Sequence, residues 1–205
     1  MKGEITLREK AEESITWEEC KAISEELIAK ASAFDEALYQ AFPAKKGLYI
    51  FCYDGTELGG SLWEKESPII YIGRAGADSI RHWRDNTGVS TVRRSLAAML
   101  ASALALEAIP GSDDPEDNDR YTNYRLTPES ETKLTEWMKA NIKVAFLEMA
   151  ENEVEDRYNA LVNFNTPKLN FQGNPYNTFG QQIKSYRKIL TEMAMAYDMQ
   201  NQPAK

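Results

Sequence analysis

The chain has 205 residues, of which 42% are hydrophobic and 27% are charged. These values are typical of a soluble globular protein with one elaborated domain. The formal net charge of −8 argues against a protein that merely coats nucleic acid, because phosphate binding normally requires a basic surface. No apolar run approaches the ~20 residues of a membrane span, and the N-terminal segment lacks the pattern of a signal peptide. We therefore expect a cytoplasmic protein without membrane association.

The N-terminal part of the chain predicts a helical extension. Apolar side chains recur at helical spacing over residues 16–42 until Pro43 ends the pattern, and Ser32 marks a candidate break within it. Nothing in this segment points to chemistry, so we expect it to pack on the domain that follows, with a partner-binding arm as the alternative. Cys20 in this helix and Cys52 in the next strand lack the spacing of a metal site, which favours two buried thiols.

The most informative stretch is a predicted hairpin that leads into a helix. Residues 47–53 are apolar and rich in β-branched and aromatic side chains, as expected for a strand. A glycine-containing turn follows at residues 54–60, and a second strand is predicted over residues 69–72. After a short link, residues 77–84 begin with the capping residues of a helix.

Polar side chains converge at one end of this predicted unit. Tyr49 and Tyr71 lie on adjacent strands, and Arg81 lies on the helix beside them. Two phenols and a guanidinium at one sheet end form a candidate anion site, although two strand tyrosines also pack across hairpins for purely structural reasons. His82, the sole histidine, is a further candidate base. Its alternative is a surface position, because neighbouring helix residues point about 100° apart.

The rest of the chain predicts further helices, short strands and an acidic loop. The predicted elements are helices over residues 91–107, 127–140, 151–164 and 178–199, and strands over residues 121–126 and 142–149. The loop over residues 109–119 carries a run of acids without the glycine and the terminal glutamate of a calcium-binding loop. We interpret it as a solvated insertion.

Together these elements predict an α+β fold, with a small, mainly antiparallel three-stranded sheet flanked by helices and with helical extensions at both ends. The N-terminal extension covers residues 1–45. The central domain covers residues 46–175, with an insertion at about residues 108–127. The C-terminal helix, within residues 176–205, is expected to pack on this domain.

Two tripeptides of the hairpin resemble a known family signature. Gly47-Leu48-Tyr49 and Tyr71-Ile72-Gly73 are similar to the paired motif of the GIY-YIG nucleases. Arg81 follows the second tripeptide by eight residues, the offset of that family's catalytic arginine, and residues 167–170 resemble its later P-x-x-N segment. The resemblance covers about residues 46–174. It implies the fold of that family and an endonuclease activity on DNA, or on RNA.

The resemblance also implies a mechanism, in which phosphodiester bonds are hydrolysed with Mg²⁺ or Mn²⁺ as cofactor. Arg81 would clamp the scissile phosphate through its planar fork, which lysine does not mimic. Tyr49 would act as the general base or position the water, and nearby positive charge would have to lower a phenol pKa of about 10. Tyr71 would orient water or phosphate, and His82 is the additional catalytic candidate.

The metal-binding carboxylate is where the sequence departs from the family's pattern. Counting back from the P-x-x-N segment puts Tyr158 at the position of the family's glutamate, or Arg157 with a slightly longer spacing. If the helix runs longer before the proline, Glu155 restores the motif, and Glu155 is our predicted metal ligand and catalytic carboxylate. Glu153 and Asp156 are the nearby alternatives. Without such a ligand, the fold would serve as an inactive module that binds nucleic acid or a protein partner.

Contacts with nucleic acid are expected from cations close in sequence to the predicted catalytic arginine. The predicted contacts are Arg74, Arg84, Arg93 and Arg94, together with Asn170 as a structural or site hydrogen-bonding residue. For Arg93 and Arg94, the alternative is a solvated helix face. A further interpretation of the whole chain is an unrelated α+β domain, in which Tyr49, Tyr71 and Arg81 would lie far apart.

Overall fold

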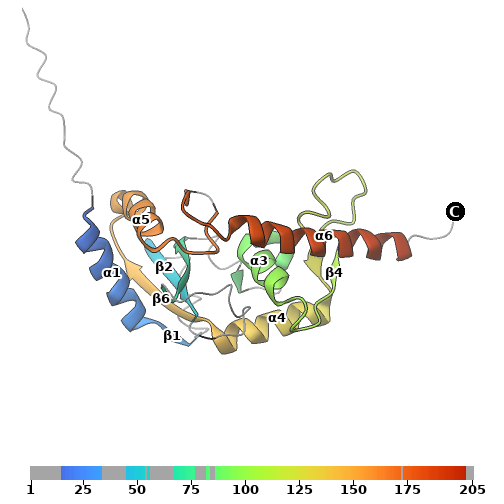
Figure 1. The fold of residues 1–205 in the computed structure, drawn as a ribbon, viewed down its shortest axis with the longest axis horizontal. Helices are drawn as coiled ribbons and strands as arrows, with labels where there is room; N and C mark the ends of the chain where they lie inside the picture. The colour runs from blue at the N-terminus through green and yellow to red at the C-terminus, as the bar shows by residue number, and fades with distance from the viewer. Residues whose placement is uncertain are drawn as a thin grey trace, which may run out of the picture.

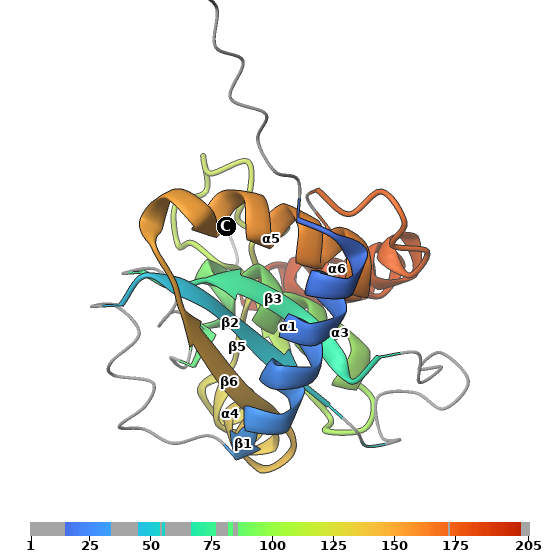
Figure 2. The ribbon, with the colours of Figure 1, turned by 90° about the vertical axis from the view of Figure 1, so that its left-hand side faces the viewer.

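The computed structural model describes residues 15–33, 45–53, 55, 67–76, 82–83, 86–171 and 173–201. A four-stranded antiparallel sheet forms the centre of the fold (Figures 1 and 2). In spatial order its strands are β1 (Ser32–Ala33), β6 (Lys143–Glu148), β2 (Gly47–Cys52) and β3 (Ile69–Arg74). The α+β class and the three main strands are confirmed. Strand β1 adds a fourth that was not predicted, because two residues are too few to produce a sequence pattern.

Helices cover both faces of this sheet. They are α1 (Trp17–Lys30), α3 (Thr91–Leu100), α4 (Pro128–Asn141), α5 (Glu151–Asn165) and α6 (Gly180–Asn201), with the short 3₁₀ helix η4 (Thr87–Val89) before α3. A separate two-stranded sheet is formed by β4 (Ala108–Ile109) and β5 (Arg125–Leu126). In Figure 1, α1 and α5 lie to the left of the main sheet, and α3, α4 and α6 lie to its right. None of the described helices combines the length and the apolar run that crossing a membrane requires.

Strand β2 is buried along its whole length and divides the core in two. Leu48 and Ile50 belong to the cluster that α1 and α5 complete. Tyr49 and Phe51 belong to the second cluster, which α3, α4 and α6 complete. Because side chains alternate along a strand, the aromatic residues of β2 project toward α3 and α6.

Helix starts are set by capping side chains in the sequence. At α1, the Thr16 hydroxyl accepts the N–H of Glu19, and the Glu19 carboxylate accepts the N–H of Thr16 in return. At α4, Thr127 is the cap and Pro128 is the first helical residue. At α3, the Ser90 hydroxyl caps the helix by accepting the N–H of the third helical residue at 3.1 Å.

Two predicted helices are shorter than their sequence patterns. The first ends at Lys30, just before the candidate break near Ser32, and residues 34–44 lie outside the described part of the chain. Helix α3 ends at Leu100 instead of residue 107. Residues 101–105 form turns, and Ala105 adopts a left-handed backbone conformation, with φ of 48°, before the chain reaches β4.

A buried ion pair joins α3 to α4. Arg93 is 0% exposed, and its guanidinium donates to the Glu131 carboxylate at 2.7 Å and to the Thr135 hydroxyl at 2.9 Å. The same carboxylate accepts the N–H of Thr87 at 2.7 Å and that of Leu126 at 3.2 Å. The Glu131 side chain therefore connects four elements: α3, α4, η4 and β5.

The substitution Glu131→Gln should lower the free energy of unfolding by about 3 kcal/mol, because it leaves the Arg93 guanidinium buried without its counter-ion. The control is Glu129→Gln, in the exposed first turn of the same helix, where Glu129 pairs with a surface lysine. The control should change the free energy of unfolding by less than about 0.5 kcal/mol. Urea unfolding followed by circular dichroism measures both values. Equal stabilities of the two variants would contradict a structural role for the buried pair.

Candidate active site

The glycines of both tripeptides are required by the packing of the sheet. Tyr49 pairs with Gly73 across β2 and β3, and a Cβ atom added at Gly73 would lie 2.2 Å from Cζ of the Tyr49 ring. Gly47 has a φ of +150°, and a Cβ atom there would lie 2.1 Å from the carbonyl oxygen of Leu147. Any side chain at Gly73 would displace the Tyr49 ring, so the second glycine fixes where that ring lies.

Three side chains of the predicted site lie together. The ring centroids of Tyr49 and Tyr71 are 5.9 Å apart, and those of Tyr71 and His82 are 5.4 Å apart. Tyr49 is only 2% exposed, whereas Tyr71 is half-buried. The proximity of the two tyrosines argues against the interpretation as an unrelated domain, which required them to be far apart. Because Tyr49 is buried and Tyr71 is only half-buried, Tyr71 is the more accessible of the two phenols.

The start of α3 holds His82 in place. The His82 ring is 2% exposed, and its Nδ1 lies 2.8 Å from the Ser90 hydroxyl. Ser90 is also the cap of α3, so one hydroxyl fixes both the helix start and the imidazole. The ring also packs edge-on against Tyr71 and Phe51. His82 is therefore a buried, oriented group rather than a surface residue.

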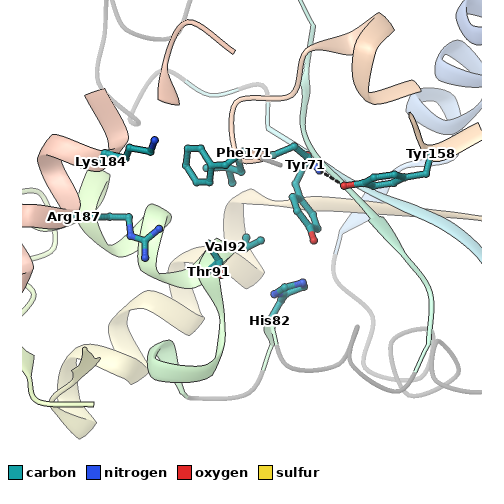
Figure 3. A pocket seen from close by; sticks show the side chains of 10 residues that line it. Tyr71, His82, Thr91, Val92, Tyr158, Phe171, Lys184 and Arg187 are labelled. Carbon is teal, nitrogen blue, oxygen red and sulfur yellow. Dashed lines mark hydrogen bonds between the residues drawn. The ribbon is translucent and has the colours of Figure 1, made fainter. Parts of the chain in front are cut away.

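Tyr71 and His82 lie in the wall of a pocket of about 330 Å³. Tyr158 of α5, Lys184 and Arg187 of α6, the start of α3 and the segment after α5 complete the wall. Figure 3 shows the two cations of α6 on the side opposite Tyr71 and His82. The pocket therefore combines phenol and imidazole groups with positive charge.

Asn170 ties the segment after α5 to β3. Its amide oxygen accepts the N–H of Ile72 at 2.9 Å, and its amide nitrogen donates to the Ile72 carbonyl at 2.8 Å and to the Tyr158 hydroxyl at 3.1 Å. The N–H of Leu169 donates to the Ile70 carbonyl at 2.9 Å, so this segment follows the edge of β3. Both amide hydrogens of Asn170 are used within the protein, which favours a positioning role over the predicted contact with nucleic acid.

Glu155, the predicted metal ligand, is not part of the pocket wall. Its side chain is 60% exposed and pairs with Arg74, whose guanidinium lies 4.7 Å from the Tyr158 ring centroid. Tyr158, three residues later on α5, takes the position that faces the pocket. Helix α5 ends one residue beyond its predicted end, which is too little to bring Glu155 forward by a turn. The alternative ligand Glu153 pairs with Arg157 at 3.3 Å.

The donor set of the pocket does not fit the hard divalent ion that the resemblance implies. Its polar groups are phenol, imidazole, hydroxyl, amide, ammonium and guanidinium, and none of the described residues in its wall is an acid. Mg²⁺ prefers oxygen ligands and is usually held by one or two carboxylates. Among the residues that the structure describes, no three His, Cys, Asp or Glu side chains form a group that could hold a metal ion.

Two of the predicted arginine contacts are corrected by the structure. Arg93 cannot reach a phosphate, because it is fully buried and paired with Glu131. Arg94 is also buried, and its guanidinium donates to the carbonyls of Thr87 and Gly88, so it belongs to the fold as well. Arg74 is half-exposed but paired with Glu155. Sequence proximity to the predicted catalytic arginine therefore did not indicate accessibility.

Some predicted groups fall on residues that the structure does not describe. Arg81 and Arg84, with most of the predicted helix over residues 77–84, lie outside the described residues, as does most of the predicted turn over residues 54–60. The roles assigned to Arg81 and Arg84 stay predictions.

Sequence reasoning missed the cations of α6. Lys184 and Arg187 are three residues apart and therefore share one face of the helix. They follow Ile183, a buried core residue. Basic residues at helical spacing beside a core position were the available signal, but they lie more than a hundred residues from Tyr71 in the sequence.

A buried phenol lies behind these cations. The Tyr124 hydroxyl donates to the Arg94 carbonyl at 2.8 Å. Burial raises the pKa of Tyr124, and the nearby guanidinium groups of Arg187 and Arg94 act in the opposite direction. Tyr124 therefore stays a neutral hydrogen-bonding group beside Arg187.

Comparison with known proteins identifies one family. The model of the GIY-YIG catalytic domain matches residues 53–189, which include Tyr71, His82, Tyr158 and both cations of α6. No curated protein and no solved structure matches the chain. The match covers well over half of the sequence and includes the second tripeptide, Tyr71-Ile72-Gly73, while the first tripeptide lies before its start. The chain therefore belongs to the GIY-YIG family of nuclease domains.

Proposed function

We propose that the protein is an endonuclease that hydrolyses phosphodiester bonds in DNA, and that the reaction takes place in the pocket of Tyr71 and His82. The observation that carries this proposal is the shared pocket itself. It brings the tyrosine of the second tripeptide and the sole histidine to within 5.4 Å, opposite two cations. Family membership supports the same reaction class.

Hydrolysis of a phosphodiester needs an activated water and stabilisation of the negative charge that develops on the phosphate. His82 is well suited as the general base, because histidine most often has this role and the contact with Ser90 orients its ring. Tyr71 would hydrogen-bond the water or the phosphate. Tyr49, buried behind it, would hold the Tyr71 ring in position rather than act as the base. Arg81 keeps its predicted role as a clamp on the scissile phosphate.

Dependence on Mg²⁺ or Mn²⁺ through Glu155 stays a prediction that this donor set does not favour. Glu155 pairs with Arg74 on the surface, and the position on α5 that faces the pocket holds the phenol of Tyr158. The same observation favours a second candidate function, in which the domain binds nucleic acid without cutting it. Binding without turnover, with a salt dependence that indicates several phosphate contacts, would distinguish this function from the first.

The substitution Tyr71→Phe should lower the rate of plasmid cleavage by about 100-fold, because it removes a hydroxyl that contacts the reacting groups but keeps the ring. The control is Tyr176→Phe, since Tyr176 is 69% exposed and lies outside the pocket. Supercoiled plasmid is incubated with each protein in Mg²⁺, in Mn²⁺ and in EDTA, and nicked and linear products are quantified on gels. If the two variants cut equally well, Tyr71 is not catalytic. If wild-type protein cuts under none of these conditions but binds DNA, the second candidate function is correct.

Tyr158→Glu should create cleavage that depends on added Mg²⁺ or Mn²⁺, at a rate about tenfold or more above that of wild-type protein. It places a carboxylate in the pocket wall, where a divalent ion could stabilise the charge on the phosphate. Tyr158→Gln is the matched control, because it has the same size as the glutamate variant without its charge. The same plasmid assay measures both. Equal rates for the two variants at every metal concentration would show that position 158 does not hold a metal ion.

A further inference from the structure

The C-terminal helix contributes positive charge to a pocket whose other walls come from distant parts of the chain. Lys184 and Arg187 of α6 line it on the side opposite Tyr71 and His82 (Figure 3). Helix α6 is held firmly, because Ile183, Leu190 and Ala194 are buried in the core that includes α3. The two cations are therefore carried by a rigid element and not by a loop.

The lack of a carboxylate partner among the described residues distinguishes these two cations from several other cations of the protein. Lys188, on the same helix, lies 3.9 Å from Glu192, Arg120 pairs with Asp198 at 3.0 Å, and Arg74 pairs with Glu155. Among the described residues, neither Lys184 nor Arg187 forms an ion pair with a carboxylate, and no acid lines the pocket. Two positive charges in a pocket whose described wall carries no acid favour a negatively charged ligand.

Arg187 is close to a buried phenol. Its guanidinium lies beside the buried Tyr124 hydroxyl, which in turn donates to the Arg94 carbonyl. A guanidinium at this position can present its planar fork to two phosphate oxygens. Lys184, which is exposed, would act as a mobile point charge next to it.

The start of α3 adds donors on a third side. Thr91 and Val92 line the pocket and are the first two residues of this ten-residue helix. The N–H groups of the first helical turn have no partner within the helix, and the Ser90 hydroxyl accepts only that of the third residue. Such a helix start attracts phosphate, because its partial charge is positive like the charges of Lys184 and Arg187.

We propose that Lys184 and Arg187, together with the start of α3, form a subsite that binds a phosphate of the nucleic-acid backbone without a divalent metal ion. The subsite rests on the proposed function, since it holds the strand at the pocket where cleavage would occur. Its charge neutralises the phosphate in a pocket where none of the described wall residues offers a carboxylate to a metal. The subsite would bind the phosphodiester group, which DNA and RNA share, so both backbones fit.

The test is binding of a fluorescently labelled DNA duplex of about 20 base pairs, measured by anisotropy in EDTA over a range of salt concentrations. Lys184→Gln and Arg187→Gln should each weaken binding about five- to tenfold and reduce the slope of log K against log salt by about one. Arg187→Lys keeps the charge and should retain the slope while weakening binding. The matched control Lys188→Gln removes the same charge from the same helix and should change binding by less than about twofold.

Wild-type affinities and slopes in Lys184→Gln and Arg187→Gln would overturn the subsite, and so would wild-type binding that appears only when Mg²⁺ is added. Thermal unfolding of each variant, followed by circular dichroism, checks that a binding loss is not a folding loss. Plasmid cleavage is measured separately on the same proteins. A wild-type protein that binds in EDTA through these residues but never cuts would refute the endonuclease activity and leave the subsite standing. Variants that bind normally but cut slowly would refute the subsite and leave the endonuclease standing.

Discussion

The structure depends on the burial of β2 between β3 and β6, with helices on both faces. Every side chain of this strand is enclosed, so its two faces serve two separate cores. The face toward α3 and α6 carries Tyr49. The neighbouring strand β3 must have a glycine, Gly73, at the paired position, because a side chain there would collide with the Tyr49 ring. Both glycines of the paired tripeptides thus follow from packing as much as from chemistry. A site attached to such a strand is held by the most rigid part of the protein.

Buried polar groups hold the surrounding elements in register. The Glu131 carboxylate accepts hydrogen bonds from Arg93 and from two backbone N–H groups. The Asn170 amide hydrogen-bonds both the N–H and the carbonyl of Ile72. Unpaired buried groups of this kind would cost substantial free energy, so each network specifies one arrangement of its elements. The cations of the protein therefore have two different roles. The arginine with the deepest burial stabilises the fold, and the cations of α6 face the pocket.

The sequence was sufficient for the architecture and for the centre of the site. Strand composition, capping residues and the paired tripeptides predicted β2, β3, β6, the start of α4 and the proximity of Tyr49 to Tyr71. The charges of the site were harder to predict, because sequence distance says little about which cations are exposed. Arg93 is close to Tyr71 in sequence but buried, whereas Lys184 is remote in sequence but lines the pocket. The two-residue strand β1 and the early end of α3 depend on tertiary packing and on one left-handed residue, neither of which leaves a periodic pattern.

The hydroxyl of Ser90 serves two partners at once, the first turn of α3 and the imidazole of His82. Helix ends open far more readily than helix centres. Unwinding of that one turn would release the histidine ring at the same moment, so fraying and misorientation are a single event. That turn also contains Arg93, whose ion pair with Glu131 is buried, so its opening requires the contact between α3 and α4 to break. The orientation of the His82 imidazole is therefore linked to the packing of α3 against α4.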